Sequence, residues 1–153
     1  ELAGSGNRIV EFACGLSPFI TEVPSFKERY GVDFSPKTLE KASKRYPQVK
    51  YILADCKKTL PFEDKFFDVS VAGEVIEHLR NPESFIGEMA RVTQRRMIIS
   101  TPYMEYDDKE HLWEFDESDL IRMFSHYGKS KCETIHSKWF PGRSYIFAWC
   151  VMS

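Results

Sequence analysis

The sequence has few cysteines and no long apolar run. Only four of its 153 residues are cysteine, and no two of them are spaced as C-x-x-C, which favours reduced thiols over a disulfide framework. No apolar run approaches the roughly 20 residues that a membrane-crossing helix needs, and no basic-then-apolar leader opens the chain. We therefore expect a cytoplasmic location and no membrane segment.

An excess of charge of one sign is also absent. The 21 lysines and arginines nearly balance the 23 aspartates and glutamates, so the formal net charge is −2. A near-neutral chain has no general attraction to a polyanion, which disfavours nucleic acid as a partner and favours a small-molecule substrate. The length and the 42% hydrophobic content fit one globular domain. We expect residues 8–153 to form it, with residues 1–7 as a linker or disordered N-terminus.

Short apolar runs alternate with helical patterns along the chain. The runs that predict strands cover residues 8–12, 30–34, 49–54, 68–73, 96–100, 131–136 and 145–152. Helices are expected from near Pro18 until Pro24, after Ser35-Pro36, after Asn81-Pro82, and from Asp116 until Gly128. A Pro141-Gly142 turn joins the last two strands. This order predicts an α/β fold with a mostly parallel sheet and helices on both faces.

Acidic and small residues follow the first three expected strands, where such sheets bind ligands. Small side chains at Ala13, Gly15 and Ser17 let a ligand approach the backbone after Glu11. Asp33 ends the second run, where a carboxylate accepts hydrogen bonds from ribose hydroxyls. Asp55, followed by Cys56, is placed to accept one from an exocyclic amine.

Two cofactors compete for this pattern. A nicotinamide dinucleotide favours G-x-G-x-x-G, but the corresponding positions are Ala13, Gly15 and Pro18, and its pyrophosphate is repelled by Glu11. S-adenosylmethionine carries a sulfonium and an ammonium and no phosphate, so acidic neighbours stabilise it. The pattern favours S-adenosylmethionine.

The chain resembles the class I S-adenosylmethionine-dependent methyltransferases over about residues 8–128. The resemblance rests on V-E-F-A-C-G-L-S at 10–17, G-V-D-F-S at 31–35, A-D-C at 54–56, the block from Leu60 to Leu79 that ends in E-V-I-E-H-L, S-T-P-Y at 100–103, and H-L-W-E-F-D at 111–116. It implies a Rossmann-like seven-stranded sheet with a reversed last strand. Ala13 and Ser17 replace glycines that are usual in the family.

The resemblance also implies a cofactor site. By position, Ala13, Gly15 and Ser17 would flank the methionine portion, Asp33 the ribose, Asp55 and Cys56 the adenine, and Gly73 and Glu74 the pocket floor, with Glu11, Cys14 and Phe34 completing the cofactor-binding set. Tyr103 and Met104 would line the acceptor pocket. The implied reaction is an in-line methyl transfer to a small molecule or biosynthetic intermediate.

The E-V-I-E-H segment leaves the acceptor chemistry open. His78 and His111 are the candidate catalytic bases, although His111 could equally contact substrate or anchor a loop. In a helical turn, Glu74, Glu77 and His78 would share a face, and His111 could complete a metal site like that of small-RNA 3′-terminal 2′-O-methyltransferases. We favour bracing or substrate-contact roles and no metal. That RNA-end methyltransferase and a non-catalytic cofactor-binding module remain the alternatives.

Overall fold

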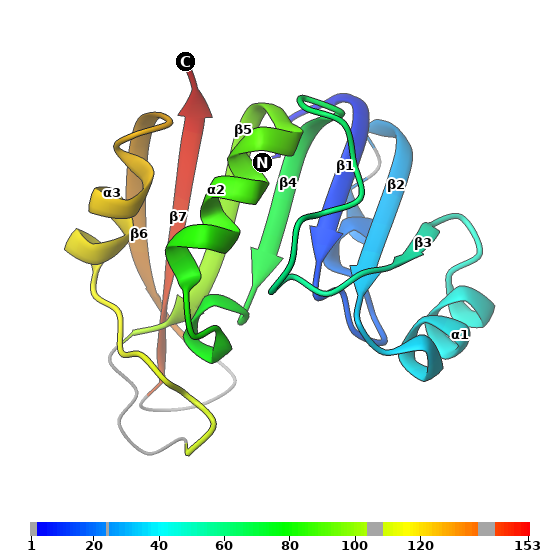
Figure 1. Cartoon of the computed structure of the whole chain (residues 1–153), viewed down its shortest axis with the longest axis horizontal. Helices are drawn as coiled ribbons and strands as arrows, with labels where there is room; N and C mark the ends of the chain where they lie inside the picture. Colours follow the sequence, from blue (N-terminus) through cyan, green and yellow to red (C-terminus); the bar gives the residue numbers. More distant parts are fainter. Residues whose placement is uncertain (1–2, 24, 104–108, 138–142) are drawn as a thin grey trace.

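A computed structural model describes residues 3–23, 25–103, 109–137 and 143–153 of the chain. Seven strands form one sheet in the order β3-β2-β1-β4-β5-β7-β6 (Figure 1). The strands are β1 Gly6–Phe12, β2 Phe26–Asp33, β3 Lys50–Leu53, β4 Phe67–Gly73, β5 Thr93–Pro102, β6 Gly128–His136 and β7 Ser144–Met152. The first five pair in parallel, and β7 runs antiparallel to both β5 and β6. This confirms the expected Rossmann-like sheet with a reversed terminal pair.

The predicted caps start the three α-helices. They are α1 Pro36–Arg45, α2 Pro82–Val92 and α3 Glu117–Phe124. Ser35, Asn81 and Asp116 each accept a hydrogen bond from a backbone N–H of the first turn, which compensates for the missing intrahelical partners. Two short 3₁₀ helices, η1 Phe19–Glu22 and η2 Ile76–His78, follow β1 and β4.

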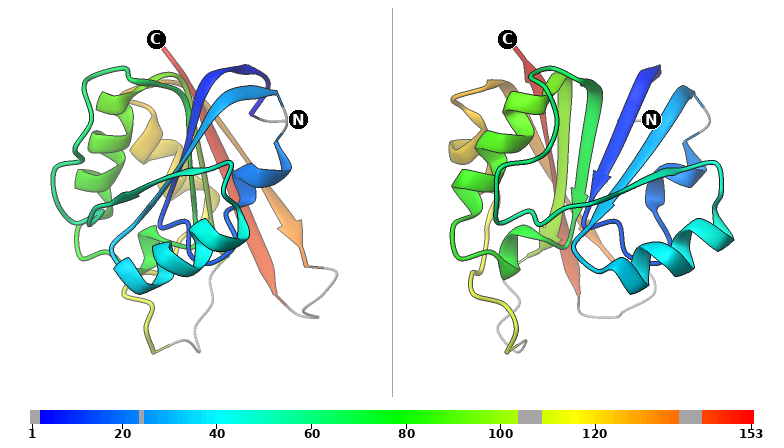
Figure 2. Two further views of the ribbon diagram at one scale, coloured as in Figure 1. Left: turned by 90° about the vertical axis from the view of Figure 1, so that its right-hand side faces the viewer. Right: turned by 45° about the vertical axis from the view of Figure 1, so that its right-hand side comes forward.

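Both faces of the central strands are apolar, and side chains alternate between them. On one face Val10, Phe12 and Ile99 pack with residues of α2 and α3. On the other, Ile9 and Ile98 pack with Ile20 of η1. Figure 2 shows α2 and η1 on opposite sides of the sheet. Such burial on both sides is typical of parallel strands and explains the short continuous apolar runs.

Several element boundaries differ from the sequence prediction. Strand β1 begins at Gly6 rather than Arg8, because Gly6 pairs with Phe26 and the Asn7 N–H donates to Asp68 Oδ2 at 2.7 Å. Residues 6 and 7 therefore belong to the sheet and not to the expected linker. Strand β2 ends at Asp33, which leaves Phe34 outside it.

Gly128 does not end the last helix as predicted. Helix α3 already ends at Phe124, and Gly128 is the first residue of β6. A Cβ atom at this position would lie 2.0 Å from the carbonyl oxygen of Val151, so only glycine permits this close approach of β6 to β7. Pro24 and the Pro141-Gly142 turn lie outside the described residues. Among those that are described, no helix has the length and apolar character that crossing a bilayer requires.

Candidate cofactor and acceptor site

The strand order reverses between β1 and β4, and the site is built where their carboxyl ends meet. After β1 the backbone of Ala13 and Gly15 takes the left-handed conformation, with φ of 53° and 58°. Cys14 between them donates its N–H to the carbonyl oxygen of Val32 at 3.0 Å, which holds the turn against β2. Ala13 is in a conformation that disfavours any side chain, which agrees with the glycine that the family resemblance implies at this position.

Asp33 holds this loop. Its Oδ2 accepts from the Gly15 N–H at 3.1 Å and its Oδ1 from the Ser35 N–H at 2.9 Å. The side chain is buried at the end of β2. Both carboxylate oxygens thus already have backbone partners, so Asp33 fixes the loop, and contact with a ribose would use its remaining lone pairs.

Glu11 is buried under η1. Its Oε2 accepts the Ile20 N–H at 3.0 Å, so the carboxyl group supports the short helix after the loop. Burial raises the pKa of Glu11 to about 7, against which the backbone hydrogen bonds from Ile20 and Phe19 have a smaller, lowering effect. The acid that was predicted to attract a cationic cofactor is therefore partly protonated near neutral pH.

A cavity of about 540 Å³ opens beside the loop, a volume typical of small-ligand pockets. Five of the predicted cofactor residues line it, namely Ala13, Phe34, Asp55, Cys56 and Glu74, together with the predicted catalytic His78. The other six predicted cofactor residues are not part of its lining: Glu11, Cys14, Gly15, Ser17, Asp33 and Gly73. The structure thus separates the predicted set into residues that face the cavity and residues around it.

Sequence reasoning missed five lining residues, which are Ala54, Lys57, Val75, Leu79 and Glu110. All five adjoin a predicted residue, as Glu110 adjoins His111, or belong to the E-V-I-E-H-L motif, which was a signal available in the sequence. Glu110 reaches the cavity from a distant loop, and only the folded chain shows this.

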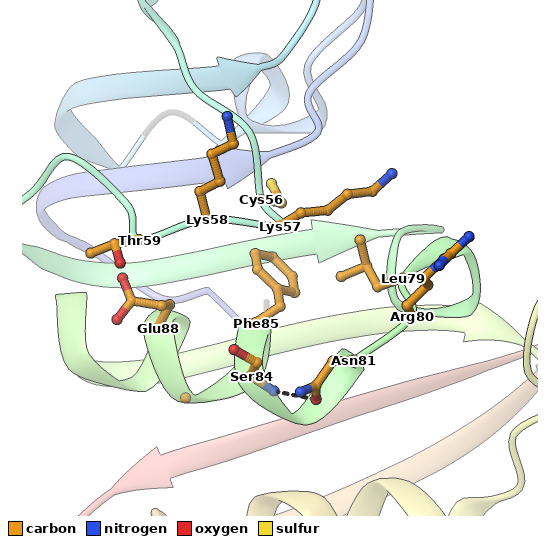
Figure 3. Close-up of a pocket in the computed structure, with 11 residues that line it drawn as sticks. Cys56, Lys57, Lys58, Thr59, Leu79, Arg80, Asn81, Ser84, Phe85 and Glu88 are labelled. Carbon is orange, nitrogen blue, oxygen red and sulfur yellow. Dashed lines mark hydrogen bonds between the residues drawn. The ribbon is translucent and has the colours of Figure 1, made fainter.

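A second cavity of about 880 Å³ adjoins the first and shares Cys56, Lys57 and Leu79 with it (Figure 3). It lies between the segment after β3 and α2. Lys57, Lys58 and Arg80 contribute cationic groups, and Ser84 and Asn81 lie at its floor, where the Asn81 side chain caps α2. A ligand in the first cavity can therefore extend toward a basic surface.

Aromatic and sulfur side chains contribute apolar surface to the first cavity. The Phe34 side chain is 73% exposed and offers a flat face to a heteroaromatic ring. Burial raises the pKa of the Cys56 thiol to about 12, and burial does the same for Cys14, with Glu11 and Asp33 adding to the effect. Both groups remain thiols at neutral pH and act as packing residues rather than nucleophiles.

The E-V-I-E-H segment forms a 3₁₀ turn and not the α-helical turn considered from the sequence. Glu74 precedes the turn in the left-handed conformation, with φ of 53°, and donates its N–H to the Ser100 carbonyl oxygen at 2.9 Å. Glu77 is buried, and His78 and His111 stack edge to face with ring centroids 4.9 Å apart. The structure therefore brings the two predicted catalytic histidines together.

The predicted acceptor residues are less well supported. The Tyr103 N–H donates to the Ser144 carbonyl oxygen at 2.9 Å, and its side chain is 39% exposed, but it does not line either cavity. Met104 lies outside the described residues. Their contact with an acceptor stays a prediction.

Comparisons with known proteins agree with this geometry. A family model described as "Methyltransferase domain" matches residues 10–99, more than half of the chain. The chain therefore belongs to the class I S-adenosylmethionine-dependent methyltransferase family. One relative by sequence and two solved structures with the same fold show how far the likeness extends.

Sterol 4-C-methyltransferase strm-1 of Caenorhabditis elegans is 25% identical over 144 residues, which cover 85% of this chain. The chain spans 43% of that relative's length. The YcgJ protein of Bacillus subtilis shares the fold with a TM-score of 0.75, 16% identity and coverage of 97% and 93% of the two chains. Magnesium protoporphyrin IX methyltransferase of Synechocystis, crystallised with S-adenosylhomocysteine, gives a TM-score of 0.77, 17% identity and coverage of 97% and 75%.

S-adenosylmethionine is the cofactor of this family, and the cavity fits it. Asp55, Glu74 and Glu110 place three carboxyl groups around the opening against the single ammonium of Lys57, which suits a cationic ligand. The exposed face of Phe34 suits the adenine. When bound, the cofactor supplies a methyl group activated by the sulfonium charge.

Proposed function

We propose that this chain is the catalytic domain of an enzyme that methylates a small-molecule acceptor. The observation that carries the proposal is the mostly apolar cavity with acidic side chains at the reversal of strand order, bounded by Ala13, Phe34, Asp55 and Glu74. The sterol and porphyrin substrates named for two relatives support a small organic acceptor, and the near-neutral charge of the chain supports it further.

Each residue has a distinct task in this proposal. Phe34 contacts the adenine face, Asp55 accepts from its exocyclic amine, and Asp33 fixes the loop and reaches the ribose. Glu74 attracts the cationic methionine portion. His78 and His111 lie at the acceptor end, where one of them accepts the proton of an acceptor hydroxyl. The fixed loop and turn align the reactants, which is the main requirement of an in-line displacement.

Calorimetry with S-adenosylmethionine, S-adenosylhomocysteine and NAD tests the cofactor assignment. We expect the first two to bind and NAD to give no heat beyond dilution. Ile135→Ala is a suitable control, since Ile135 lies on β6 away from both cavities and is exposed. Labelled methyl transfer to a panel of hydroxylated sterols, phenols and porphyrins then tests the acceptor class. Binding without transfer to any acceptor would support the non-catalytic module instead.

A further inference from the structure

Three hydrogen bonds dock the segment 110–113 onto η2 and the residue after it. The Leu112 N–H donates to the Glu77 carbonyl oxygen at 2.8 Å, and the Trp113 indole N–H donates to the Leu79 carbonyl oxygen at 2.7 Å. His78 Nδ1 lies 3.1 Å from the Glu110 carbonyl oxygen. These contacts hold His111 beside His78 through the backbone, so the pairing does not depend on the imidazoles attracting each other.

The contact with Glu110 also sets the tautomer of His78. A carbonyl oxygen only accepts, so Nδ1 carries the proton and the neutral ring has its lone pair on Nε2. Histidines that bind metals are commonly oriented in this way, with one ring nitrogen donating to a backbone carbonyl.

Glu77 is buried near the two histidines, and one of its carboxyl oxygens makes no hydrogen bond within the described part of the chain. The residue is 1% exposed, and its Oε2 accepts from the Thr101 hydroxyl at 3.1 Å. Its Oε1 has no hydrogen-bond partner among the described residues. Burial raises the pKa of Glu77, while its own backbone N–H and, to a smaller extent, His78, Thr101 and His111 lower it. A buried carboxyl oxygen without a partner is destabilising unless a cation or a donor reaches it.

These side chains present one ligand atom each within a small space. A carboxylate oxygen of Glu77 and a ring nitrogen of each histidine all lie within 4.8 Å of one another. Two ligands at about 2.1 Å from one tetrahedral ion are about 3.4 Å apart, so the widest pair in the site has to close by up to about 1.4 Å. Side-chain rotation can supply such a change.

We propose that Glu77, His78 and His111 bind a divalent transition-metal ion of the Zn²⁺ type. Two imidazoles and one carboxylate form a donor set that suits Zn²⁺ and its first-row neighbours and leaves positions open for a further ligand, whereas Mg²⁺ prefers an all-oxygen environment. His78 also lines the cavity, so an ion bound by it would lie beside the space proposed for the reactants. This proposal rests on the proposed function and assigns an oxygen acceptor, whose hydroxyl pKa the ion lowers. With the ion bound, His78 and His111 act as its ligands and no longer as proton acceptors.

Metal binding to chelator-treated protein tests the site directly. Titration with Zn²⁺ by calorimetry, and with Co²⁺ followed by its visible absorption, should give one ion per chain. Glu77→Gln and His111→Gln should each weaken binding by roughly tenfold or more. His126→Gln is the matched control, because His126 is exposed on the surface and lies outside the cluster, and it should bind as the wild type does. His111 is half-buried, so His111→Gln stays informative if Glu77→Gln fails to fold by circular dichroism.

The outcomes separate this site from the cofactor site. Equal uptake of Zn²⁺ by the wild type and by the Glu77→Gln/His111→Gln double variant would overturn the proposal, as would preferential binding of Mg²⁺. S-adenosylhomocysteine affinity is measured on the same samples. Cofactor binding with no specific metal binding overturns only the metal site, while metal binding without cofactor binding overturns the proposed function and keeps the site.

Discussion

Two pairs of acids at the carboxyl ends of neighbouring strands have opposite environments. Glu11 and Asp33 are buried, and their oxygens accept backbone N–H groups of the loops that follow β1 and β2. Asp55 and Glu74 line the cavity. All four occupy the position at which this fold binds ligands, yet only the second pair lines the cavity, although Asp55 Oδ1 also accepts the Lys57 N–H at 2.9 Å. Position at a strand end therefore predicts proximity to the site and not the direction of the side chain.

The pH dependence of stability should show the largest contrast between the pairs. The pKa of Glu11 is 4.5 when unperturbed and about 7 in the folded chain. The contribution of Glu11 to the free energy of unfolding is then fully present below pH 4.5 and is lost as the pH rises to 7, because only the unfolded chain releases the proton in that range. Glu11→Gln removes this loss, which amounts to about 3 kcal/mol. Urea unfolding at pH 5 and pH 8 should show that the free energy of unfolding of the variant, relative to that of the wild type, is higher at pH 8 than at pH 5.

The exposed Glu22 of η1 provides the control for that measurement. Glu22→Gln should leave the difference between the two pH values unchanged. A Glu11→Gln effect that is the same at pH 5 and pH 8 would show that Glu11 is ionised in the folded chain.

Asp33→Ala should affect both the loop and the ligand. It leaves the part-buried N–H groups of Gly15 and Ser35 without their acceptor, which should lower the free energy of unfolding by about 1 to 2 kcal/mol and weaken cofactor binding by about 1 to 3 kcal/mol. Asp55→Ala, from the pair that faces the cavity, should weaken binding with little loss of stability. Denaturation and calorimetry on both variants make the test, and unchanged affinity in Asp33→Ala would remove the ribose assignment.

Phe34→Ala should act on binding alone. The ring is largely exposed, so its removal costs little stability, but it should weaken cofactor binding by about 1 to 2 kcal/mol through lost stacking. Calorimetry with S-adenosylhomocysteine measures the change, with Ile135→Ala as the control. If Phe34→Ala lowered only the free energy of unfolding and left the affinity unchanged, the adenine would lie elsewhere.

Ala13→Gly should give the smallest effect, and it should be stabilising. Glycine relieves the left-handed strain at this position, and after the extra flexibility of the unfolded chain is subtracted the gain is about 0.5 to 1 kcal/mol. Ala54→Gly is the matched control, because Ala54 also lines the cavity but is not among the residues with positive φ, and it should destabilise. Thermal melts of the two variants should therefore shift in opposite directions.

The sequence predicted most of the fold because its signals are local. Alternating apolar runs located all seven strands, and Ser35, Asn81 and Asp116 located the three α-helix starts. Strand ends were less accurate, since the pairing of Gly6 with Phe26 depends on a neighbouring strand.

For the site, the sequence identified the region but not the orientations. That Asp33 points at the Gly15 loop, that Glu77 is buried, and that His111 meets His78 all depend on contacts between distant segments. No single-sequence pattern carries that information. The departure at Ala13 was visible in the sequence, but its strain required the backbone.

Helix α2 passes into β5 without an intervening loop, since Val92 ends the helix and Thr93 begins the strand. The Thr93 hydroxyl donates to the Met89 carbonyl oxygen at 2.5 Å and lies 2.7 Å from the Ser70 hydroxyl of β4. One inserted residue here would either shift β5 by a position, turning Met97 and Ile99 to the opposite face of the sheet, or break this junction. Changes in chain length during evolution should thus be excluded at this point and accommodated in the longer segment between β3 and β4.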